Sequence, residues 1–303
     1  MSIADEELAE QRAAVDRIET PSRLRVVAGR FFGSAQGRIG FALLTLVFLL
    51  AFAGPYLTRW TYADKDFTAF LQPPSARHWW GTLQTGADVY AVTLRGMQKS
   101  LVVGLLAAVA GTALAAVVGA FAGYFGGWTD RSLTWVTDLL LVLPAFLILA
   151  IVSPLFPEGR WPLFVLVLAL FLWMVTSKIV RSMTVSLKER EFVKAARFMG
   201  VPPTTIIFRH ILPNMSSLLV VDATLNVSVA ILTETSLSYF GFGIRPPDVS
   251  LGSLIADGAG TAVYAPWTFW FCAGLLVVTV LAVNLVGDAL RDAFDPASRR
   301  SAG

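Results

Sequence analysis

Six runs of about 20 mostly apolar residues recur along the chain, and each is long enough to cross a bilayer as a helix. Hydrophobic residues make up 55% of the 303 residues and charged residues only 15%, a balance typical of membrane proteins. The sequence therefore predicts an all-α integral membrane protein with six transmembrane helices and both termini on one side. The predicted spans are Ile39–Leu57, Ser100–Tyr124, Leu133–Pro154, Pro162–Val180, Ser217–Leu237 and Trp267–Leu285.

Basic residues in the connecting loops predict the orientation, because Lys and Arg concentrate on the cytosolic side. They are dense before the first span, between the fourth and fifth spans, and after the sixth, whereas the loop between the fifth and sixth holds only Arg245. The loop after the first span weakens the contrast with Arg59, Lys65, Arg77 and Arg95. We expect cytosolic N and C termini.

Four segments follow from this orientation. Residues 1–38 form a cytosolic N-terminal tail, 39–99 the first span and an external loop, 100–296 a five-span core, and 297–303 a C-terminal tail. The N-terminal tail has no apolar core or cleavage site of a signal peptide. It contains either an amphipathic helix around Glu6–Ile18 or a partly disordered stretch, and the sequence does not choose between them.

The sequence lacks the motifs of several kinds of functional site. The chain has a single cysteine, Cys272, and two distant histidines, His78 and His210, so we expect no disulfide and no metal site. No phosphate-binding G-x-x-x-x-G-K-[ST] motif occurs. The net charge of +3 gives no reason to expect nucleic-acid binding. We therefore expect no cofactor bound by this chain and no enzymatic site.

Two spans carry backbone signals. Gly119 and Gly123 have the small-x-x-x-small spacing that lets helices approach closely. Pro144 lies inside the third predicted span and is expected to kink it or open its hydrogen-bond ladder.

The fifth span carries polar residues at helical spacing. Asp222, Asn226 and Thr233 fall on one face, with Glu234 near one end. Because ionisable groups are costly in hydrocarbon, this face should point at other helices or at a water-filled path. One interpretation is a stripe lining a substrate path. The other, which we favour, is interhelical hydrogen bonding or a carboxylate close enough to the surface to be solvated.

The segment Arg190–Asn214, REFVKAARFMGVPPTTIIFRHILPN, is basic and amphipathic and lies between two spans. Phe192, Ala195, Ala196 and Met199 follow the i, i+3, i+4, i+7 pattern of one helical stripe. Gly200, followed by two prolines, predicts an elbow. A second short helix is expected over Thr205–Leu212, ended by Pro213. The small alanines suit insertion into a groove on a protein partner better than burial in lipid.

The stretch KAARFMGVPPTTIIFRHILPN resembles the cytosolic coupling loop of bacterial ABC-importer permeases. Ala195, Ala196, Gly200, Leu212 and Pro213 occupy the places of that motif, whereas Lys194 replaces a Glu and His210 an Ile. Further resemblances to the peptide-importer branch are GAFAGYFGGWTD, LTETSLSYFGFGIRPPDVSLGSLI and PWTFWFCAGLLVVTVLAVNLVGDALRDAFDP. HWWGTLQTGADVYAVTLRG departs from the branch, because Leu83 stands for an Asp and Ala87 for an Arg, so we expect no ion pair there.

The resemblance implies a type I ABC-importer permease architecture in the bacterial inner membrane, the second permease subunit of a dipeptide or oligopeptide importer. It implies a homologous permease subunit as heterodimer partner, two cytosolic ATPases that bind ATP and Mg²⁺, and an extracytoplasmic peptide-binding protein. Residues 183–214 would be the coupling loop. Alternatives are the same fold with another cargo, such as a nickel chelate, glutathione or a sugar, and, with less support, a membrane enzyme or a passive channel. The residues expected to couple to the ATPase are Glu191, Phe192, Lys194, Ala195, Ala196, Arg197, Met199, Gly200, Arg209 and Pro213.

Overall fold

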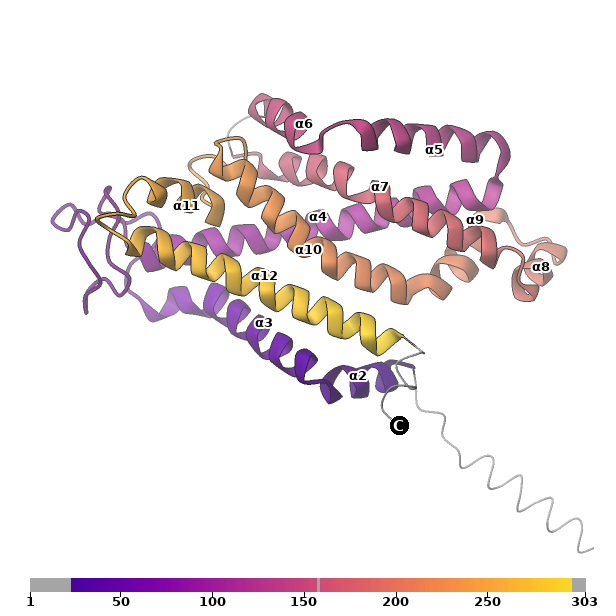
Figure 1. Cartoon of the computed structure of the whole chain (residues 1–303), viewed down its shortest axis with the longest axis horizontal. Helices are drawn as coiled ribbons and strands as arrows, with labels where there is room; N and C mark the ends of the chain where they lie inside the picture. Colours follow the sequence, from indigo (N-terminus) through magenta and orange to yellow (C-terminus); the bar gives the residue numbers. More distant parts are fainter. Residues whose placement is uncertain (1–22, 157–158, 296–303) are drawn as a thin grey trace, which may run out of the picture.

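The computed structural model describes residues 23–156 and 159–295. Within them, five helical segments are long and apolar enough to cross a membrane, and a bent pair makes a sixth. The five lie side by side along one direction (Figure 1). They are α3 with a short 3-10 turn (Ala35–Leu57), α4 (Val89–Phe125), α7 (Trp161–Leu187), a helical path ending in α10 (Pro203–Tyr239) and α12 (Trp267–Phe294). The all-helical prediction is confirmed, and each predicted span falls on one of these elements.

The sixth element is broken at the predicted proline. Helix α5 (Gly127–Val142) and helix α6 (Ala145–Val152) meet at an angle of 82°. Pro144 has no N–H to donate, and Leu143 adopts an extended conformation. The Pro144 carbonyl instead accepts the first bonds of α6, from Leu147 N and Ile148 N. The predicted kink at Pro144 is confirmed, and it is sharp enough to divide the span into two helices.

Helix α4 lies at the centre of the bundle because its glycines admit other helices. A Cβ at Gly123 would lie 2.6 Å from the Arg181 carbonyl oxygen of α7, and one at Gly119 would meet the Ser177 carbonyl oxygen even more closely. A Cβ at Gly104 would likewise lie too close to the side chain of Ile231 of α10, at 2.5 Å from its Cγ1. The predicted helix pairing through Gly119 and Gly123 is confirmed, with α7 as the partner.

The two ends of the described chain lie together. Helix α2 (Arg23–Gly33) packs Phe31 between Ala289 and Ala293 of α12. Arg30 Nη1 donates to the carbonyl oxygens of Ala293 (3.2 Å) and Asp295 (3.3 Å), which lack helical partners at the end of α12. Most of the predicted tail, including Glu6–Ile18, lies outside the described residues, but its last part is this helix. Helix α8 (Glu191–Phe198) lies at the same end of the bundle, which we call the α8 end.

The opposite end, the α11 end, contains α11 (Leu251–Ala259) and the loop between α3 and α4. In that loop His78 is buried, with Nδ1 2.8 Å from Asp88 Oδ2 and Nε2 3.4 Å from Asp66 Oδ2. Hydrogen bonds from Thr68 lower the pKa of Asp66 to about 2. Leu83 and Ala87 occupy the two positions at which we expected no ion pair. Their backbones are hydrogen-bonded, with Leu83 N donating to Ala87 O at 2.9 Å.

Candidate functional site

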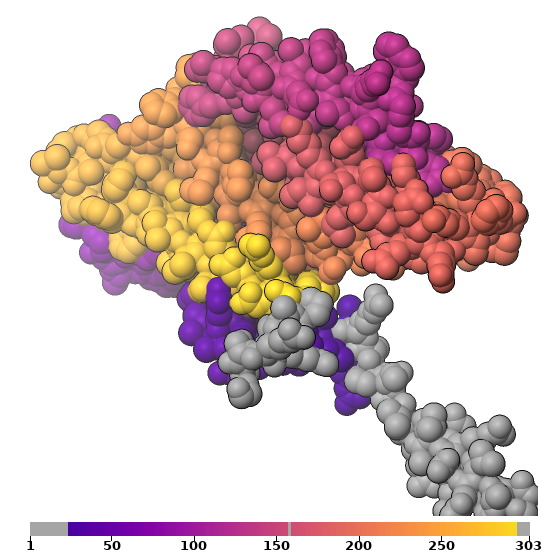
Figure 2. All heavy atoms as spheres, turned by 45° about the vertical axis from the view of Figure 1, so that its right-hand side comes forward, coloured from indigo at the N-terminus to yellow at the C-terminus, as the bar shows by residue number. Residues whose placement is uncertain are grey.

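The candidate site is an elbow at the α8 end, which forms one tip of the molecule (Figure 2). Helix α8 (Glu191–Phe198) ends in a Schellman motif, in which Val201 N donates to Ala196 O and Gly200 N to Arg197 O, both at 3.1 Å. Gly200 has φ +77°, a conformation that L side chains adopt at a cost. The predicted elbow is therefore confirmed. A Cβ at Gly200 would meet no atom within 4 Å, so the space beside the turn is open.

One face of α8 is anchored to the bundle. Val193 and Ala196 are each 1% exposed and pack in a cluster with Ile206, Ile207 and Ile211. The prediction that Ala196 shares an outward stripe with Ala195 is therefore wrong. The larger Val193, three residues earlier, selects the inward face, and the small Ala196 lets α8 approach the isoleucines closely.

The opposite face of α8 is apolar and exposed. Phe192 is 41% exposed, Phe198 91% and Met199 75%, and Ala195 is also exposed between them. We call Phe192, Ala195, Phe198 and Met199 the α8 face. Phe198 was missed from the sequence because it falls outside the predicted i, i+3, i+4, i+7 stripe, although a large aromatic residue shortly before a helix-ending glycine was a visible signal. An exposed apolar cluster of this kind marks an interaction surface.

The second half of the elbow differs from the prediction. A short α-turn, α9 (Pro203–Ile206), passes into a π turn (Ile207–Ile211), a 3-10 turn (Leu212–Met215) and then α10 (Ser216–Tyr239). Leu212 N donates to Ile207 O, five residues back. Pro213 therefore does not end a helix at Leu212, because the wide turn before it changes the hydrogen-bond register where the missing N–H falls. Arg209 and Pro213 are exposed and line an open groove with Thr204, Thr205 and Phe208.

Charged side chains surround the α8 face. Glu191, Lys194 and Arg197 are all exposed. Lys194 Nζ lies 3.2 Å from Glu189 Oε2, an exposed pair that contributes little to stability. Glu191 in the first turn and Arg197 in the last turn complement the helix dipole. This arrangement gives an apolar centre with a charged rim.

One polar contact connects the segment before α8 to the bundle, and two ion pairs join α7 to α5. Lys188 Nζ donates to Gly123 O at 3.2 Å. Arg181 of α7 forms a two-pronged ion pair with Asp130 of α5, the most specific geometry available to these groups. Lys178 pairs with Asp138, also from α7 to α5. The chain just before α8 is thus bonded to α4, and the helix that leads into it, α7, is bonded to α5.

The polar residues of α10 are divided between two places. Asp222 accepts hydrogen bonds from Thr112 of α4, Thr176 of α7 and Asn226. Glu234 is fully buried and accepts from Ser100 of α4 (2.9 Å) and Ser238 (2.6 Å). Thr233 donates to Val229 O on its own helix. Asp222 and Glu234 therefore both form interhelical bonds, the interpretation favoured from the sequence.

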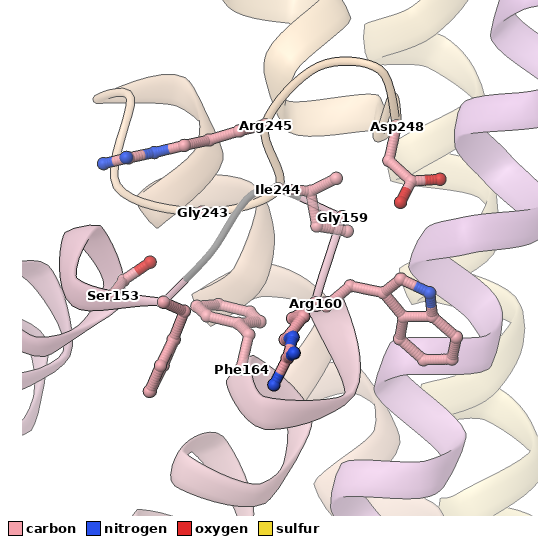
Figure 3. Close-up of a pocket in the computed structure, with 10 residues that line it drawn as sticks. Ser153, Gly159, Arg160, Phe164, Gly243, Ile244, Arg245 and Asp248 are labelled. Carbon is pink, nitrogen blue, oxygen red and sulfur yellow. The ribbon is translucent and has the colours of Figure 1, made fainter.

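A pocket at the α11 end is lined by the end of α6, the start of α7 and the loop after α10 (Figure 3). Arg160 and Arg245 extend in different directions, and Asp248 is paired with Lys99 at 2.8 Å. Lys99 Nζ also lies 4.5 Å from the centre of the Trp161 ring. The cavity holds about 30 Å³, room for about two water molecules, which is too small for a peptide.

The candidate spans, and the polar groups buried between them, are those of a multi-pass membrane protein. Residues 115–300 match the family described as "Binding-protein-dependent transport system inner membrane component". Residues 22–74 match "N-terminal TM domain of oligopeptide transport permease C". The chain belongs to the family of binding-protein-dependent transport system inner membrane components.

Curated relatives agree along nearly the whole chain. The oligopeptide transport system permease protein OppC of Mycobacterium tuberculosis is 53% identical over 282 residues, which cover 93% of this chain and 97% of the relative. A putative peptide permease protein of Brucella suis is 39% identical over 89% of each chain. OppC of Bacillus subtilis is 33% identical over 89% of this chain and 88% of the relative. These names are those of transport proteins rather than enzymes, and the family is an inner-membrane one.

Proposed function

We propose that the chain is a permease subunit of an ATP-driven importer of di- and oligopeptides, with the α8 end in the cytosol. The exposed α8 face, beside an elbow held by backbone hydrogen bonds, is the observation that carries this proposal. The names of the relatives support peptides as the cargo. The partners would be a homologous permease, two ATPases that bind ATP and Mg²⁺, and an extracytoplasmic peptide-binding protein.

The α8 face would insert into a groove on one ATPase. When the two ATPases close on ATP, the groove would move α8, and Val193 and Ala196 would transmit the displacement to α4, α7 and the path into α10. The Arg181–Asp130 pair and Lys188 would keep α5 and α4 moving with α7. A bundle of this kind alternates access by repacking between two discrete arrangements.

Phe198→Glu tests the docking surface. Because Phe198 is almost wholly exposed, the substitution should leave the fold intact but place a charge in the apolar centre of the interface. We expect the amount of ATPase that co-purifies with the permease to fall at least about tenfold, the size of a central contact. Val263→Glu, at an equally exposed site at the α11 end, is the matched control. Equal ATPase recovery with both variants would exclude the α8 face as the docking surface.

Uptake measurements test the cargo. A strain that lacks the chain, complemented with the wild-type gene, should regain uptake of labelled di- and oligopeptides in an ATP-dependent manner. Labelled nickel chelate, glutathione and sugar are tested in the same strain. Restoration of one of these in place of peptides would keep the importer but replace its cargo.

A further inference from the structure

Asp222 is a carboxylate inside a membrane-spanning helix, two turns from the start of α10. Thr112 Oγ1 and Asn226 Nδ2 donate to its Oδ2 at 2.7 and 2.9 Å, and Thr176 Oγ1 donates to its Oδ1 at 2.7 Å. All three of these hydrogen-bond partners are donors. Three hydrogen bonds stabilise a carboxylate but supply no counter-charge, and an ionisable residue at such depth is costly unless it is paired or reached by water.

No cation of the described chain pairs with Asp222. The basic residues of the neighbouring helix α7 are engaged elsewhere, since Lys178 pairs with Asp138 and Arg181 with Asp130. Lys188 donates to a backbone carbonyl of α4. Arg291 of α12 lies in the same groove as Asp222, but no ion pair joins the two within the described residues. Within residues 23–156 and 159–295, therefore, no ion pair balances the charge of Asp222.

Asp222 lines an open groove rather than a closed core. The groove encloses about 460 Å³, within the range of small-molecule sites. Two carboxylates and one guanidinium, from Asp222, Asp295 and Arg291, lie among apolar walls of α7, α10 and α12. A short peptide as a zwitterion carries the complementary ammonium and carboxylate. The lining residues are Ile179, Ser217, Leu218, Val221, Asp222, Arg291, Phe294 and Asp295.

We propose that Asp222 is a contact site for the terminal ammonium group of a peptide in transit, within the groove formed by α7, α10 and α12. This inference rests on the proposed function. The hydrogen bonds from Thr112, Thr176 and Asn226 hold the carboxylate in place, and the arriving ammonium supplies a counter-charge that no described residue provides. An ammonium is a suitable ligand because carboxylates accept several charge-assisted hydrogen bonds from it.

Carbodiimide coupling tests the contact without the binding protein. The assembled importer, in nanodiscs without nucleotide, is treated with a water-soluble carbodiimide and either trialanine amide or ethylamine, each with a single amine. The activated carboxyl carbon of Asp222 forms an amide bond with the amine nitrogen, while the carbodiimide leaves as its urea. Mass spectrometry measures labelling at Asp222 and at Asp138, an exposed reference carboxylate.

We expect trialanine amide to label Asp222 about tenfold faster than ethylamine does, because binding raises its local concentration, while Asp138 shows no such preference. Equal preference at the two carboxylates would overturn the proposal. So would an amide between Asp222 and a lysine of the second permease, which would show that a partner subunit supplies the counter-charge. If neither amine labels Asp222, the groove is closed to substrate, and this result would also overturn the proposal.

Uptake by variants separates the contact from a purely structural role. Asp222→Asn keeps the shape and removes the charge, whereas Thr93→Val removes one interhelical contact outside the groove, between Thr93 Oγ1 of α4 and Cys272 Sγ of α12 at 3.2 Å. We expect Asp222→Asn to lower uptake at subsaturating peptide about tenfold, with Thr93→Val within about twofold of wild type when corrected for folded protein. Equal uptake by Asp222→Asn and wild type would end this inference alone, whereas a wild type that imports no peptide would end the proposed function.

Discussion

Gly200→Asp is expected to insert and fold normally and yet to abolish peptide uptake. The new Cβ meets no atom of the chain within 4 Å, and the only internal cost is a side chain at φ +77°. That cost is about 1 kcal/mol, and Asp is among the residues that tolerate this region best. The carboxylate would point into the open space beside the α8 face, where we propose that the ATPase lies, and a buried unpaired charge at an interface costs several kcal/mol.

The measurements are uptake of labelled peptide and the melting temperature of the purified permease. Gly200→Asn is the matched control, because Asn adopts the same backbone conformation without the charge. We expect a melting temperature within a few degrees of wild type for both variants. We expect uptake at background with Asp and partial uptake with Asn. Wild-type uptake by Gly200→Asp would refute the coupling role of the elbow.

Gly119→Val is expected to remove most of the folded protein. The new side chain would collide with the Ser177 carbonyl oxygen and with Val180 of α7, and a rigid backbone cannot yield as a side chain does. Separating α4 from α7 would also disturb the bundle centre, so we expect a loss above about 3 kcal/mol, at the upper end for overpacked sites.

Size-exclusion chromatography of the detergent extract measures this effect as the yield of monodisperse permease. Gly274→Val in α12 is the control, because a Cβ there meets nothing within 4 Å. A β-branched residue has the same helix propensity at both sites. If the yields of the two variants are alike, close approach at Gly119 does not hold α4 and α7 together.

The spans could be predicted from the sequence because a helix that crosses a bilayer needs a long apolar run, however it packs against the other helices. Gly119, Pro144 and Gly200 could be predicted for a similar reason, since each acts through the backbone of its own position. Ala196 could not be placed correctly. Whether it or Ala195 faces inward depends on the isoleucines 10 to 15 residues later, with which Val193 and Ala196 pack.

Two other features depended on tertiary contacts. The π turn at Ile207–Ile211 leaves no periodic signal in a short apolar segment, so Pro213 suggested an end where the helix continues. For Asp222 the spacing predicted a shared face with Asn226, which the 2.9 Å bond confirms. The hydroxyl donors, Thr112 and Thr176, lie 110 and 46 residues away, and no local pattern identifies them.

The succession of a wide turn and a tight turn between Ile207 and Met215 also bears on how force travels along the molecule. A regular α-helix resists twisting because each carbonyl is tied to the amide four residues on. Here the hydrogen bonds run over five residues and then over three, so this stretch lacks the uniform bonding that makes a regular helix stiff. If the α8 face moves with an ATPase as we propose, we expect this irregular stretch to be where its displacement becomes rotation of α10, the helix that bears Asp222.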